Sequence, residues 1–214
     1  MNGIIADLLF GFVLSGDGEH EGLYEAVPLG FFASILSRLE GGERNYVIMT
    51  KLGCDSEAEA LRTYYADPGT SSIRYYESTC YPTALSIDGD NRLRYSALSD
   101  IKADDVKDFI DRCSVDTLFI SAALLSFKPV SREIVSAVIE RRERLGRVVV
   151  DTTLDWDILL LEEVKTSIET MMNSGLDVAV VGEALTLDGV RGMSAMKRDE
   201  ILTHLPEEES QKRI

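Results

Sequence analysis

The chain has 214 residues, of which 45% are hydrophobic and 28% are charged, and its formal net charge is −15 at pH 7. This acidic balance excludes a nucleic-acid-binding surface, because phosphate contacts need clustered lysine and arginine side chains. No run of about 18 apolar residues occurs, so the sequence predicts no membrane span.

Strand and helix patterns alternate in the first part of the chain. The apolar run 7–15 ends in turn residues and predicts a central strand, and residues 21–27 predict an exposed strand. A helix is predicted over 30–39, where Gly41 and Gly42 stop it. Residues 46–50 then predict a strand, and residues 56–65 predict a helix.

The composition changes over residues 72–97. The short segments 72–77, 83–87 and 93–97 are of β type, and no helix separates them. The turn-forming residues 88–91 (DGDN) predict a hairpin between the last two segments. We therefore expect a small antiparallel sheet set apart from the main one.

Regular alternation returns after residue 102. It predicts helices over 103–113, 131–145 and about 156–173, and strands over 117–121, 147–151 and 176–181, the last strand of the chain. Ser131 is the expected N-cap of its helix. Apolar strands between amphipathic helices predict a three-layer α/β fold, in which helices flank a mostly parallel sheet. The carboxyl ends of the strands, including Asp151, would then lie at the edge where ligands bind.

The chemical motifs are informative mainly by their absence. Neither GxGxxG nor GxxxxGK[ST] occurs, and the glycines after residue 181 are too scattered to surround a polyphosphate. Cys54, Cys80 and Cys113 have no CxxC spacing, and the two histidines are far apart, which argues against a disulfide framework and a zinc site. This cysteine usage indicates a cytoplasmic, reducing environment.

Several segments, in order along the chain, carry a resemblance to a known family: 11–14 (GFVL) with Asp17 beyond, 33–39, 51–55 (KLGCD), 80–92 (CYPTALSIDGDNR), 151–156 (DTTLDW) and 182–184. This set resembles the ribokinase-like (PfkB) carbohydrate kinases. The resemblance implies one ribokinase-like domain over residues 1–205, with a β lid formed near 19–28 and 72–97. An acidic tail over 206–214 would follow it.

The resemblance implies three substrate-binding carboxylates, Asp17, Asp55 and Asp151. The residues themselves leave other roles open. Asp17 lies among turn residues, Asp55 precedes a helix and is favoured as its cap, and Asp151 can bond the backbone of its own loop.

The departures from the family pattern fall on its chemistry. Ala26 and Val27 match the family's paired glycines, Phe31 matches its sugar-binding asparagine, and Gly182 and Leu185 stand where the NxxE motif is expected. The GAGD segment, which supplies the family's catalytic base and anion hole, has no counterpart in the 214 residues. We therefore expect no catalytic residue, no cofactor and no metal.

Three functions remain open. The leading one is a degenerate, truncated sugar-kinase-like protein without independent phosphotransferase activity, binding a small sugar or polyol. The second is a carbohydrate kinase, a phosphotransferase with an alcohol acceptor, whose ATP and magnesium site is completed by a partner chain. The third is a regulatory module that forms a homodimer through the β lid.

Overall fold

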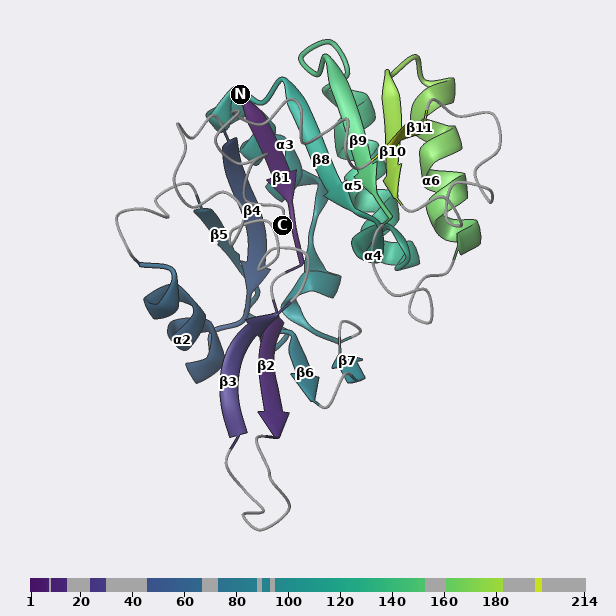
Figure 1. Cartoon of the computed structure of the whole chain (residues 1–214). Helices are drawn as coiled ribbons and strands as arrows, with labels where there is room; N and C mark the ends of the chain where they lie inside the picture. Colours follow the sequence, from purple (N-terminus) through teal and green to yellow (C-terminus); the bar gives the residue numbers. More distant parts are fainter. Residues whose placement is uncertain are drawn as a thin grey trace, which may run out of the picture.

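The computed structural model of the protein describes residues 1–7, 9–14, 24–29, 46–66, 73–87, 90–92, 95–152, 161–182 and 195–197. These residues form two sheets of different size (Figure 1). Asp17 and the predicted helix over 30–39 lie outside the described residues. In the described ranges, no helix is long and apolar enough to cross a membrane.

The larger sheet has seven strands in the order β11-β10-β9-β8-β1-β4-β5, and every neighbouring pair is parallel. Its strands are β1 (Asn2–Ile5), β4 (Tyr46–Leu52), β5 (Ile73–Glu77), β8 (Thr117–Ser121), β9 (Arg147–Asp151), β10 (Val178–Gly182) and β11 (Ala195–Lys197). The predicted three-layer α/β fold with a parallel sheet is confirmed.

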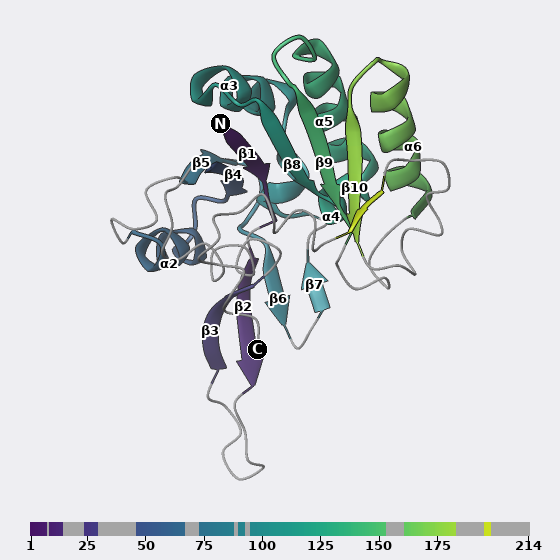
Figure 2. The ribbon, with the colours of Figure 1, turned by 45° about the horizontal axis from the view of Figure 1, so that its top comes forward.

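Helices cover both faces of this sheet (Figure 2). On one face lie α3 (Ala103–Cys113), α5 (Lys128–Glu140) and α6 (Leu161–Asn173), and on the other lies α2 (Ser56–Tyr64). A short helix, α4 (Ala122–Leu125), follows β8 directly. The predicted helices 56–65 and 103–113 are confirmed, because their apolar residues recur with the helical period.

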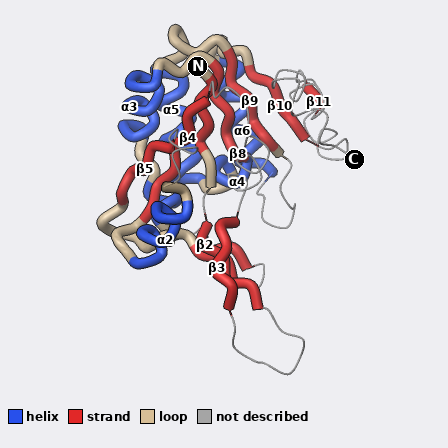
Figure 3. The backbone as a smooth tube through the Cα atoms, turned by 60° about the vertical axis from the view of Figure 1, so that its left-hand side comes forward, coloured by secondary structure: helices blue, strands red, loops and turns tan. Residues whose placement is uncertain are grey.

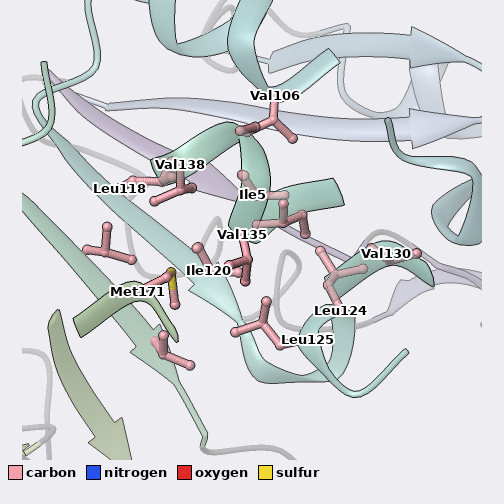
Figure 4. Packing of buried hydrophobic residues seen from close by; sticks show 14 of the residues in the cluster. Ile5, Val106, Leu118, Ile120, Leu124, Leu125, Val130, Val135, Val138 and Met171 are labelled. Carbon is pink, nitrogen blue, oxygen red and sulfur yellow. The ribbon is translucent and has the colours of Figure 1, made fainter. Parts of the chain in front are cut away.

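The main core lies between the sheet and the three helices on its first face (Figure 4). Ile5 of β1 and Ile120 of β8 are fully buried there, together with Val138 of α5 and Met171 of α6. Burying one such side chain contributes about 1.5–3 kcal/mol. Gly3 of β1 is required at its place, because a Cβ there would lie 2.7 Å from the Val115 side chain and 3.1 Å from that of Phe109.

The smaller sheet has the strand order β3-β2-β6-β7 and extends from the carboxyl edge of the larger one (Figure 3). Its strands are β2 (Leu9–Leu14), β3 (Tyr24–Leu29), β6 (Leu85–Ile87) and β7 (Asp90–Arg92). The β2–β3 and β6–β7 pairs are antiparallel, whereas β2 and β6 are parallel. The sheet is therefore mixed, and the expectation of a purely antiparallel sheet was wrong.

Three strand predictions also need correction. The central strand is Asn2–Ile5, and the apolar run after it, β2, belongs to the smaller sheet. Residues 73–77, expected in the smaller sheet, form the edge strand β5 of the larger one. Of the third expected strand, 93–97, residues 93–94 lie outside the described residues, and Ala97 starts a 3-10 turn, η2 (Ala97–Asp100). The sequence of a short apolar segment does not determine which strand it pairs with, because pairing depends on contacts between distant parts of the chain.

Two further predictions were wrong at element ends. Ser131 lies inside α5, which starts at Lys128 with Pro129 in its first turn, and the Ser131 hydroxyl donates to Lys128 O at 3.1 Å. Proline suits this position because its missing N–H would have no helical partner there. The strand β11 extends the sheet beyond the last predicted strand.

Candidate functional site at the carboxyl edge of the large sheet

A row of four polar residues crosses the large sheet near its carboxyl edge. Thr50 of β4 is paired with Tyr75 of β5, and Ser121 of β8 is paired with Asp151 of β9. Between the two pairs runs β1, whose Ile5 is level with Met49 and Ile120, so the next residue, Ala6, is level with Thr50 and Ser121. We call Tyr75, Thr50, Ser121 and Asp151 the polar row.

All four side chains start from the same face of the sheet. Successive residues of a strand point to opposite faces. Thr50 alternates with Ile48 and Leu52, which pack with α2, and Tyr75 packs against that same cluster. Ser121 shares its face with Phe119, which contacts this cluster, and Asp151 shares its face with Val149. With neighbouring strands about 4.8 Å apart, the row from Tyr75 to Asp151 extends over about 19 Å.

Three hydroxyl groups of the row are buried and lack hydrogen-bond partners. Within the part of the chain that the structure describes, this holds for Thr50 Oγ1, Ser121 Oγ and Tyr75 OH. Both Thr50 and Ser121 are fully buried. A buried polar group without a partner costs about 1–3 kcal/mol, so such groups commonly mark an incomplete polar site.

Burial raises the pKa of Tyr75 to about 12, although the positive charge of Arg62 acts in the opposite direction. Its phenol is therefore protonated at neutral pH and can donate a hydrogen bond. Ser121 is the N-cap residue of α4, but its side chain does not bond the helix backbone. Its hydroxyl thus remains available for another partner.

Two carboxylates lie at the same edge. Asp151 is the last residue of β9 and is partly buried, which is the position expected for it from the sequence. Asp7 follows Ala6 directly and is 2% exposed. Asp17 lies outside the described residues; the strand preceding it, β2, runs away from the large sheet (Figure 1).

Asp55 does not belong to the polar row. One carboxylate oxygen accepts hydrogen bonds from Ala58 N at 2.9 Å and Thr83 Oγ1 at 2.6 Å, and the other accepts from Thr83 N at 2.6 Å. It therefore caps α2 and also holds the chain that leads to β6. Burial alone would raise the pKa of this carboxyl, but these hydrogen bonds outweigh burial and lower it.

Thr50, Ser121 and Tyr75 were not selected from the sequence. Thr50 and Ser121 are the last residues of predicted strands, and the rule that ligands bind at carboxyl edges would have indicated both. Tyr75 could not be found in this way, because its strand was expected in the other sheet.

The described residues show no site for a metal ion or a polyphosphate. Among them, no three histidine, cysteine, aspartate or glutamate side chains gather at one place. The lysine nearest the row, Lys51, points to the opposite face and contacts Asp100 and Asp105. The geometry thus offers hydroxyls and carboxylates.

We compared the chain with known protein families, sequences and solved structures. No protein-family model and no curated protein sequence matches the chain. Solved structures do match: 2-dehydro-3-deoxygluconokinase from Thermotoga maritima (TM-score 0.68, 15% identity) and fructokinase with bound ATP from Xylella fastidiosa (0.65, 14%). A PfkB family carbohydrate kinase from Listeria grayi matches with a TM-score of 0.65 and 12% identity.

The chain has the ribokinase-like fold of the PfkB carbohydrate kinases. The matches cover 90%, 88% and 94% of this chain, respectively. They cover 62%, 60% and 66% of the three kinases, so the chain spans less than two thirds of their length. Within this ribokinase-like fold, the polar row lies on the sheet edge from which the smaller sheet extends.

Proposed function

We propose that this sugar-kinase-like protein binds a neutral sugar or polyol at the polar row, and that its 214 residues alone do not transfer phosphate. The observation that carries the proposal is the alignment of three buried, unpartnered hydroxyls on one face of the sheet. The fold supports it, because the structures with this fold include carbohydrate kinases.

The chemistry of the row suits a ligand with several hydroxyl groups. Each sugar hydroxyl both donates and accepts a hydrogen bond, as do the hydroxyls of Thr50 and Ser121. The Asp151 carboxylate adds an acceptor, and Tyr75 adds a donor. A ligand that reaches the hydroxyl of Thr50, Ser121 or Tyr75 would remove the cost of leaving that hydroxyl unsatisfied.

Charge narrows the ligand class to neutral molecules. Asp151 and the nearby Asp7 contribute carboxyl groups to the edge, whereas the described cation beside the row, Arg62, lies at its outer end, 6.0 Å from the centre of the Tyr75 ring. Lys51 starts from the opposite face, 2.6 Å from Asp105 Oδ2, with only 5% of its side chain exposed. An anionic sugar would meet the carboxyl groups of Asp151 and Asp7 at this edge, so we expect it to bind more weakly than a neutral one.

Phosphate transfer requires more than a row of hydroxyls. Catalysis of this step depends on positioning and on electrostatic stabilisation of the transferred phosphoryl group. The 214-residue sequence contains neither a glycine-rich phosphate loop nor the GAGD segment. This absence supports binding without independent catalysis.

The binding proposal is tested by calorimetry with neutral sugars and polyols on the purified chain. We expect at least one to bind, and we expect Ser121→Ala and Thr50→Val each to weaken binding by about tenfold. Ser167→Ala is the matched control, because this buried serine lies on α6, beyond the other face of the sheet, and donates to Glu163 O. Equal loss in all three variants, or no binding across the panel, would contradict the proposal.

The catalytic part is tested separately by titrating the chain with ATP and magnesium. We expect no heat of binding and no sugar phosphate by mass spectrometry. Micromolar nucleotide affinity would reject this part and favour a kinase. If phosphorylation arises only after a cellular partner is added, the kinase completed by a second chain is the correct function.

A further inference from the structure

Two exposed cysteines lie on segments that meet where the smaller sheet leaves the larger one. Cys54 belongs to residues 53–55, between β4 and α2, and Cys80 belongs to residues 78–84, between β5 and β6. Both side chains are exposed, whereas Cys113 on α3 is partly buried. The three cysteines are free thiols.

Contacts at both ends hold the two segments side by side. At one end, Ser78 N donates to Leu52 O at 2.8 Å, and at the other, Thr83 N donates to Asp55 Oδ2 at 2.6 Å. The Cys54 thiol lies 3.6 Å from the Ser78 carbonyl oxygen. Each cysteine is therefore enclosed between contacts that join its segment to the other.

A tight turn keeps Cys80 close to this contact. Cys80 N and Tyr81 N both donate to Ser78 Oγ, at 3.4 Å and 3.2 Å. The Cα atoms of Ser78 and Cys80 are two residues apart and so at most about 7.2 Å from each other, and the turn shortens that span. A disulfide needs Cα atoms about 4.4–6.8 Å apart, so its formation requires this exposed turn to bring Cys80 within that range of Cys54.

We propose that Cys54 and Cys80 form a redox-sensitive disulfide when the protein meets a hydroperoxide. The first thiolate attacks the peroxide oxygen and becomes a sulfenic acid, and with hydrogen peroxide one water leaves. The second thiolate attacks that sulfur, forms the S–S bond and releases a second water. Overall, two thiols and one hydrogen peroxide give one disulfide and two waters, and a dithiol reductant reverses the link.

The bond would join the corner between β4 and α2 to the chain that enters the smaller sheet. It would fix this connection covalently where Asp55 and Thr83 now hold it by hydrogen bonds. This inference does not depend on the sugar-binding proposal, since neither cysteine belongs to the polar row.

The test treats the folded, reduced chain with hydrogen peroxide and counts free thiols. We expect the count to fall from three to one, peptide mapping to show one peptide pair linked through Cys54 and Cys80, and dithiothreitol to restore all three thiols. Cys113→Ser should still form the link. Cys54→Ser and Cys80→Ser should each prevent it.

Three results, each measured on the unsubstituted chain, would overturn the proposal. They are three intact thiols after treatment, oxidation to sulfinic acid without a cross-link, and a disulfide that joins Cys113 or two chains. A urea-unfolded sample shows the contribution of the fold, because there we expect mixed pairings among the three cysteines.

Discussion

Two buried threonines near the carboxyl edge have opposite surroundings. Thr83 is 1% exposed, and its hydroxyl accepts from Gly53 N at 3.1 Å and donates to Asp55 at 2.6 Å. Thr50 is 0% exposed, and its hydroxyl has no partner among the described residues. The same side chain therefore stabilises the fold at position 83 and destabilises it at position 50.

We predict that Thr50→Val raises the free energy of unfolding by about 1 kcal/mol, because it replaces an unsatisfied hydroxyl with a methyl group of similar shape. Thr83→Val should lower it by about 1–3 kcal/mol, since it leaves the Asp55 carboxylate short of a donor. Urea unfolding measures both. A loss of stability in Thr50→Val would show that its hydroxyl is satisfied in the folded protein.

Asp55 makes stability depend on pH. Its carboxyl pKa is lower in the folded chain than the ordinary 3.8, because hydrogen bonds from Thr83 and Ala58 outweigh the opposing effect of burial. A lowered pKa contributes stability that is present above the unfolded pKa and is lost as pH falls through the folded one. We predict that the stability difference between the unsubstituted chain and Asp55→Asn is largest near about pH 7 and shrinks below about pH 4.

Urea unfolding of the unsubstituted chain and of Asp55→Asn, between about pH 4 and about pH 7, measures this difference in stability. Glu169→Gln is a suitable control, because Glu169 is exposed on α6 and its side chain makes no hydrogen bond or ion pair within the described residues. A difference for Asp55→Asn that stays constant with pH would contradict the assigned hydrogen bonds.

At the scale of elements, a buried ionic cluster joins β4 to the chain segments on either side of β6 and β7. Lys51 of β4 donates to Asp100 O at 2.9 Å in η2 and to Asp105 Oδ2 at 2.6 Å in α3. Ser78, after β5, donates to Asp100 Oδ2 at 2.8 Å. In the backbone, Ala97 N donates a hydrogen bond to Pro82 O at 2.7 Å. Both connections to the β6–β7 hairpin are thereby anchored to the large sheet.

We predict that Lys51→Met lowers the free energy of unfolding by about 2–4 kcal/mol, because it leaves the partly buried Asp105 carboxylate without its cation, whereas Asp100 keeps its ion pair with Lys102. Arg112→Met is the matched control. Its pair with Asp108 is largely exposed, so its loss should cost less than about 1 kcal/mol. Similar losses in the two variants, measured by urea unfolding, would contradict a structural role for the cluster.

At the scale of the whole molecule, the smaller sheet has β3 and β7 as its outer strands. An open strand edge can pair with another chain. We expect the protein to form a homodimer through this sheet. Light scattering should give twice the chain mass, and deletion of residues 85–92 should give a monomer while retaining the anchoring contacts of Thr83 and Ala97. A monomer before deletion, or a dimer after it, would reject this mode of association.

The sequence alone predicted the type of most elements, but it did not predict which strands pair. Local periodicity was sufficient for α2, α3, β8 and β9, because burying one face of a helix or both faces of a parallel strand leaves a pattern in adjacent residues. The position of Asp151 at the carboxyl edge followed from the same pattern. The capping role favoured for Asp55 also followed, because the signal is a single residue before a helix.

Long-range pairing was decided only by the tertiary structure. It assigned 73–77 to the large sheet and the run after β1 to the small one, since strand partners are set by contacts between distant segments. The same pairing placed Tyr75, Thr50 and Ser121 in line with Asp151, and it brought Thr83 to Asp55. The sequence alone thus determined the α/β class and most of its elements through short-range periodicity. The candidate site depended on register across five strands, which no local pattern specifies.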